Sequence, residues 1–196
     1  MKKSIFLIPL LILAIVFTGC SDDDPPAPVN EEELITTVTI TLSPAGTGTD
    51  IVLKTVDMDG EGGNDPIVTV DGIETNQVTL ATGTTYTGSI ELLNESNPDD
   101  VEDITEEVAV DEADEHQFFY VIGTGLDVTT TYEDEDGDGK PIGVEFTLTA
   151  NSVSSGDLTF ILRHEPNKSA SGVAGGDITN AGGETDISET FSISVE

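Results

Sequence analysis

The chain has few cysteine, aromatic and basic residues, and each of these scarcities argues against certain functions. It contains one cysteine and no tryptophan in 196 residues, and seven phenylalanines and three tyrosines supply all its aromatic rings. A single cysteine excludes an intramolecular disulfide and argues against a cysteine-based metal site or nucleophile. So few rings argue against a carbohydrate-binding platform built on exposed aromatic side chains.

Basic residues are scarce as well. Lys and Arg number six against 39 Asp and Glu, which gives a formal net charge of −33. Residues 1–19 hold two of the six basic residues and no acidic one, so four basic and 39 acidic residues remain beyond them, a charge of −35. Such a charge repels nucleic acid phosphates and anionic lipid headgroups, and we expect neither as a partner.

Enzyme motifs are also missing. The sequence contains no G-x-S-x-G, no P-loop, no H-E-x-x-H and no glycine-rich dinucleotide motif. Its carboxylates are so numerous that proximity of two of them indicates no catalytic pair. We therefore expect a protein that is not an enzyme.

The one long hydrophobic run lies at the N-terminus. Lys2 and Lys3 precede the apolar segment 4–17 (SIFLIPLLILAIVF). A run of this length is typical of a secretory signal peptide, whereas a membrane-spanning helix needs about 20 residues. The tetrapeptide FTGC that ends at Cys20 resembles a lipobox, which implies cleavage before Cys20 and lipid attachment to its thiol. Several acyl chains on one residue would anchor the protein without spanning the membrane.

An acidic stretch and a linker follow. Ser21, Asp22, Asp23 and Asp24 resemble the export signal of Bacteroidetes-type lipoproteins, which implies an outer-membrane location facing outward; a solvated acidic tether is the alternative. Segment 25–33 (PPAPVNEEE) is expected to be a stiff polar linker. We thus predict a signal peptide over residues 1–19, the lipidated cysteine, export signal and linker over residues 20–33, and a single domain over residues 34–196.

Period-two alternation dominates the remainder. In segment 143–150, for example, Val144, Phe146 and Leu148 alternate with polar residues, as is typical of a strand with one buried face. About ten such segments, separated by Gly, Asp and Asn turns, predict an all-β, antiparallel, immunoglobulin-like sandwich. The expected strands are 34–42, 51–56, 67–70, 78–81, 86–93, 117–122, 126–132, 143–150, 157–164 and 191–195.

Segment 97–110 is ambiguous. Asn97 could cap a helix with Val101, Ile104 and Val108 on one face. Read as a strand, the same segment places Ile104, Val108 and Val110 on one side. We favour the strand.

Two acidic loops resemble calcium-binding loops. Segment 134–145 (DEDGDGKPIGVE) has the spacing of an EF-hand loop, in which alternate carboxylates converge on a hard Ca²⁺ ion. Its flanks are strand-like and Pro141 departs from the pattern, which argues against a true EF-hand. We favour a solvated acidic turn, with a calcium loop between strands as the alternative. Segment 57–65 is a weaker version. The predicted ligands are Asp134, Asp136, Asp138 and Glu145, with Asp57 and Asp59 in the second loop.

The chain contains two histidines, His116 and His164. His164 shares parity with the apolar residues of segment 157–164, which predicts a hydrogen-bonded histidine at the margin of the core. The alternative pairs it with His116 and with Glu115 or Glu165 as a transition-metal site. The distance between the two histidines depends on strand pairing, which the sequence leaves open.

Several phrases of the chain resemble a group of short flavobacterial-type surface lipoproteins: EELITTVT (32–39), DEHQFF (114–119), LRHEPNK (162–168) and GDITNAGGETDI (176–187). The resemblance extends over nearly the whole mature chain. Such proteins are often catalogued as "type 1 periplasmic binding fold superfamily" and look like companions of TonB-dependent receptors. That label names a two-lobed α/β fold, whereas the strand pattern here predicts an all-β domain.

Residues and resemblance together predict a surface-exposed outer-membrane lipoprotein that captures a ligand or serves as accessory subunit of a TonB-dependent transporter. The long loop 165–186 and the two acidic loops would form its contact surface. One alternative is a metal-binding lipoprotein, with calcium for structure or zinc or copper for uptake. Another is a structural or adhesive surface module.

Overall fold

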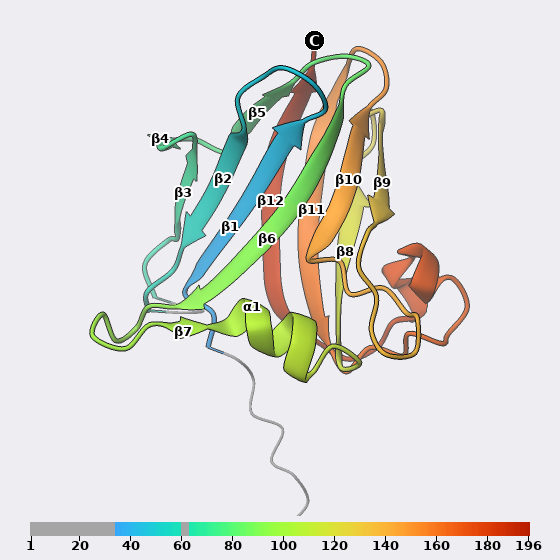
Figure 1. Cartoon of the computed structure of the whole chain (residues 1–196). Helices are drawn as coiled ribbons and strands as arrows, with labels where there is room; N and C mark the ends of the chain where they lie inside the picture. Colours follow the sequence, from blue (N-terminus) through green and yellow to red (C-terminus); the bar gives the residue numbers. More distant parts are fainter. Residues whose placement is uncertain (1–33, 60–62) are drawn as a thin grey trace, which may run out of the picture. The chain divides into compact units, whose positions relative to one another are not determined.

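The computed structural model describes residues 34–59 and 63–196 (Figure 1). The chain divides into two units, residues 1–31 and 32–196, and the second contains the folded domain. The predicted signal peptide, Cys20, the export signal 21–24 and the linker 25–33 lie outside the described residues. Within the described part, no helix is long and apolar enough for a membrane crossing.

The described residues form two sheets of a β-sandwich (Figure 1). Sheet A consists of β1 (Thr37–Pro44), β2 (Ile51–Val56), β3 (Ile67–Val70), β4 (Ile73–Glu74), β6 (Thr85–Asn94), β7 (Glu102–Asp103), β9 (Val128–Tyr132) and β10 (Glu145–Ala150). Sheet B consists of β5 (Gln77–Leu80), β8 (His116–Ile122), β11 (Ser154–His164) and β12 (Glu184–Val195).

The predicted all-β sandwich is confirmed. All ten expected segments form strands, and the two additional strands, β4 and β7, have two residues each. The strand order is β4-β3-β2-β1-β6-β10-β9 in sheet A, with β7 beside β6, and β5-β12-β11-β8 in sheet B. Every pairing is antiparallel except that of β5 with β12, which is parallel. The likeness to the immunoglobulin fold stays a prediction.

Alternating apolar residues of both sheets form the core. Phe146 of β10 and Phe160 of β11 are fully buried, and the ring of Tyr120 lies 4.7 Å and 5.7 Å from them between centroids. Gly88 of β6 makes room for this cluster, because a Cβ atom there would overlap the ring of Phe146. The period-two pattern thus becomes one continuous core between the sheets.

The strand predicted within segment 97–110 is wrong except for the two residues of β7. The chain forms a short helix α1 (Ile104–Glu106) that continues as a π-helix (Glu107–Asp111). The Asp103 side chain caps it by accepting a hydrogen bond from the Thr105 N–H at 3.0 Å. Ile104 and Val108 lie on its buried face, one turn apart, whereas Val110 is 67% exposed. The apolar residues that face the core are therefore those with helical spacing.

The long loop after β11 is folded onto sheet B. It contains two 3₁₀ turns, Val173–Gly175 and Ile178–Asn180. Val173 and Ala181 are buried against Phe119, which forms with them a second, smaller hydrophobic cluster outside the main core. The buried Gln117 side chain donates a hydrogen bond to the Val173 carbonyl at 2.9 Å and fixes the loop further.

A candidate metal centre at the histidine pair

The structure brings the two histidines together. His116 is the first residue of β8 and His164 the last residue of β11, and the two are register partners across the strand pair. Their ring centroids are 4.6 Å apart, and both residues are almost fully buried. The transition-metal prediction required this proximity, and the pairing of β8 with β11 supplies it.

Three carboxylates lie beside the pair and complete two overlapping sets of potential ligands. Glu112 joins His116 and His164 in one set, and Glu115 and Glu165 join His164 in the other. The ligand atoms within each set lie within 4.8 Å of one another. Ligands of a tetrahedral zinc ion lie about 3.3 Å apart when its bonds are about 2.0 Å long, so side-chain movements of about 1–2 Å would close either set.

The hydrogen bond of His116 favours metal binding through Nε2. Its Nδ1 lies 3.1 Å from the carbonyl oxygen of Glu112, four residues earlier. A carbonyl can only accept, so Nδ1 carries the proton and Nε2 carries the lone pair of the neutral ring. Metal-binding histidines are commonly oriented in this way by a hydrogen bond at the other ring nitrogen.

Irregular backbone shapes the other half of the site. The register of β11 with β12 shifts between Leu162 and Arg163, next to His164. Glu165 adopts a positive φ of 50°, and its N–H donates to the Glu115 carbonyl at 2.6 Å. Gly183 lies so close that a Cβ atom on it would overlap the His164 carbonyl oxygen. Bulges and left-handed residues of this kind often re-aim side chains at functional sites.

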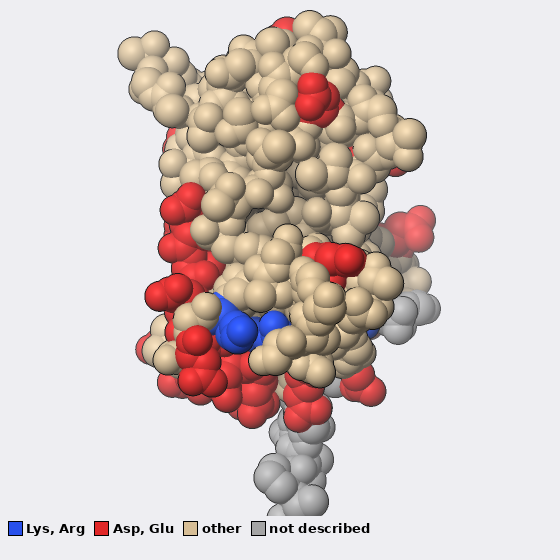
Figure 2. Space-filling model, turned by 90° about the vertical axis from the view of Figure 1, so that its right-hand side faces the viewer, with Lys and Arg blue, Asp and Glu red and all other residues tan. Residues whose placement is uncertain are grey.

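The surroundings of the pair are acidic and open to solvent on one side. The Glu115 side chain is 46% exposed and Glu165 is exposed, so an ion can approach the buried rings from their side. Figure 2 shows acidic side chains gathered at the lower end of the domain and few in its upper half. The histidines belong to that lower end, where β8 begins and β11 ends (Figure 1). Such a field attracts cations.

The predicted calcium ligands of segment 134–145 are not brought together. The carboxylate of Asp134 accepts hydrogen bonds from the N–H groups of Gly143, Val144 and Glu145 at 2.6, 2.8 and 2.9 Å. Among the described residues, only the two histidine sets have three potential metal ligands whose ligand atoms all lie within 4.8 Å of one another. The exposed Asp138 and Glu145 therefore do not converge with Asp134, whose oxygens accept backbone N–H groups instead. Burial and the nearby Asp134 raise the pKa of Glu145.

Asp136 of the same loop faces a lysine. Its Oδ1 accepts from the N–H groups of Asp138 and Lys140, and its Oδ2 accepts from the Nζ of Lys168 at 3.0 Å. Burial opposes ionisation of Asp136, but these donors hold its pKa below the ordinary value. In the second acidic loop, the Asp59 carboxylate accepts hydrogen bonds from the N–H and the side-chain amide of Asn64, so it also stabilises its own loop. The Asp57 carboxylate accepts from the Asp59 N–H, and residues 60–62 lie outside the description.

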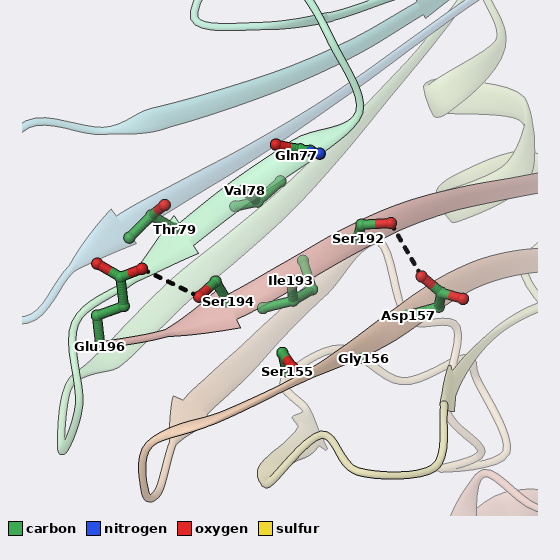
Figure 3. Close-up of a pocket in the computed structure, with 10 residues that line it drawn as sticks. All are labelled: Gln77, Val78, Thr79, Ser155, Gly156, Asp157, Ser192, Ile193, Ser194 and Glu196. Atoms are coloured by element: carbon green, nitrogen blue, oxygen red, sulfur yellow. Dashed lines mark hydrogen bonds between the residues drawn. The ribbon is translucent and has the colours of Figure 1, made fainter.

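A shallow groove of about 490 Å³ crosses β5, β12 and β11 near the other end of β11 (Figure 3). Its side chains are mostly short and polar. Ser192 donates to Asp157 at 3.0 Å and Ser194 to Glu196 at 3.2 Å, so hydroxyl and carboxylate groups satisfy each other across the lining. No aromatic ring lines this groove, and it is separate from the histidine site.

Comparison of the chain with protein-family models, with curated proteins and with solved structures finds no match. The site therefore stands on its own geometry. Sequence reasoning identified His116, His164, Glu115 and Glu165 but missed Glu112. Glu112 lies beside His116 because of the turn between them, in which the Glu115 N–H donates to the Glu112 carbonyl at 2.9 Å.

Proposed function

We propose that this chain is a lipid-anchored envelope protein whose domain binds a transition-metal ion, zinc or copper, at His116 and His164. The cross-strand pairing of these histidines beside Glu112, Glu115 and Glu165 carries the proposal. Imidazole and carboxylate groups together suit zinc, and imidazole suits copper. The protein holds the ion and does not catalyse a reaction.

The location is part of the same proposal. The lipobox resemblance at Cys20 supports a lipid anchor, and residues 21–24 support export to the outer face of the outer membrane. The resemblance to flavobacterial-type lipoproteins supports a TonB-dependent receptor as the partner. The domain would then capture metal ions at the cell surface and pass them to that receptor.

Metal titration tests the binding step. The mature chain with Cys20→Ser, which removes the acylation site, is titrated with Zn²⁺ and Cu²⁺ in the presence of a competing indicator. We expect one tight site and a loss of at least 100-fold in affinity when both histidines become Ala, because the ion loses both of its nitrogen ligands. Glu112→Gln distinguishes the two ligand sets, since it weakens binding only if the ion uses the first.

A control separates this site from general attraction to an acidic protein. Asp157→Asn removes one exposed carboxylate at the far end of β11 and should leave the tight site unchanged. Equal affinity in the wild type and the double histidine variant contradicts the proposal. Mild-detergent isolation of the tagged, acylated protein should recover a transporter, and its repeated absence counts against the partner.

A further inference from the structure

We propose that Lys168 is the positioning residue of the metal centre. Its ammonium group ties the turn that carries Glu112 and Glu115 to the segment that carries His164 and Glu165. This inference rests on the proposed function, because it concerns the arrangement of the ligands of that site.

The contacts of Lys168 are unusual for a lysine. The residue is only 6% exposed, although lysine is rarely buried without a partner. Its Nζ donates to the backbone carbonyl of Ala113 at 2.6 Å and to Oδ2 of Asp136 at 3.0 Å. Burial lowers the pKa of Lys168, and Asp136 counteracts this effect. One ammonium group therefore joins three segments that are distant in the sequence.

Two of these segments carry the metal ligands. Ala113 follows Glu112 directly and lies two residues before Glu115, so the hydrogen bond to its carbonyl fixes the turn that bears both carboxylates. Lys168 lies three residues after Glu165. The intervening chain is anchored as well, because the Asn167 N–H donates to the Ala181 carbonyl at 2.7 Å. Without the ammonium group, turn and loop would lose this direct link.

The third segment joined by Lys168 is the acidic loop that carries Asp136. Two backbone N–H groups hold Oδ1 of Asp136, which turns Oδ2 towards Lys168. The loop thus binds a cation, and that cation is the ammonium group of its own chain. Contacts that orient metal ligands from outside typically change metal affinity by about 10–100-fold when they are removed. We expect an effect of this size from Lys168.

The test compares three variants of the mature Cys20→Ser chain. Lys168→Met alone would leave Asp136 buried without its cation and could unfold the domain. The double variant Lys168→Met/Asp136→Asn removes both charges, so the fold survives while the link to Ala113 is lost. Lys54→Met, at a lysine of β2 in sheet A, is the control for Lys168→Met because it removes the same charge.

Zinc affinity, melting temperature and the Co²⁺ absorption spectrum are measured for each. We expect the metal-free double variant to melt cooperatively, to bind zinc about 10–100-fold more weakly and to give an altered Co²⁺ spectrum, since the carboxylates are displaced. Lys54→Met should match the wild type in all three. If the double variant binds as tightly as the wild type, the positioning role is overturned and the metal site stands. If the wild type binds no ion, both fall.

Discussion

Replacement of Asp134 by Ala should destabilise the domain strongly, because its carboxylate braces the loop before β10. It accepts three backbone N–H groups, and two of them belong to the buried residues Gly143 and Val144. A buried donor without a partner costs about 1–3 kcal/mol. Two such donors give a loss of about 4 kcal/mol in the free energy of unfolding, against a total of about 5–15 kcal/mol for a typical domain.

Urea unfolding of the mature Cys20→Ser chain measures this loss. With a slope of about 2 kcal/mol per molar urea, the midpoint should fall by about 2 M. Asp134→Asn keeps one acceptor oxygen and should lose about half as much. Asp138→Asn, a change of an exposed residue in the same loop, should stay within about 0.5 kcal/mol of the wild type.

The response to calcium shows whether the Asp134 carboxylate only accepts hydrogen bonds within the loop or also binds the ion. If Asp134 is a brace, millimolar calcium leaves the urea midpoints of the wild type and of Asp134→Asn unchanged. A calcium-dependent rise in the wild-type midpoint that disappears in Asp134→Asn would show that the carboxylate binds the ion. The reasoning from the three hydrogen bonds would then be refuted, and the calcium prediction would be correct.

Two further changes test the core. Burial and the nearby Asp57 raise the pKa of Glu189 above its ordinary 4.5, because both disfavour the charged carboxylate. The domain is therefore more stable when Glu189 is neutral, below pH 4.5, and loses this stability as the pH rises through the raised pKa. Glu189→Gln should therefore stabilise the domain by up to about 1 kcal/mol at pH 7, which raises the melting temperature, and should have no such effect at pH 4. Equal shifts in melting temperature at the two pH values would contradict this. Gly88→Ala should cost about 1–3 kcal/mol in urea unfolding because its Cβ meets Phe146, and Phe146→Leu in the same chain should recover part of the loss.

The strands were predictable because their signal is local. In β10, Phe146 and Leu148 alternate with threonines, and this alternation alone indicates one buried face. The helix was missed because Ile104 and Val108 satisfy both a strand and a helix. The side chain of Asp103, and not that of Asn97, caps the helix, so Asp103 marks its start in the sequence.

The site depended on long-range pairing. His116 and His164 meet only because β8 and β11 are neighbours in sheet B, and no pattern in either segment specifies that neighbour. The spacing of Asp134 and Asp136 suggested calcium, but their oxygens accept from backbone N–H groups and from Lys168. Lys168 had no signal at all, because its partners lie 32 and 55 residues away in the sequence.

The position of β12 has a consequence for the order of folding. This strand is the last in chain order, yet it lies inside sheet B between β5 and β11. A growing polypeptide therefore cannot complete that sheet until residues 184–195 have been made. Until then β5 has no partner strand in sheet B, and the sandwich closes only when β12 inserts between β5 and β11.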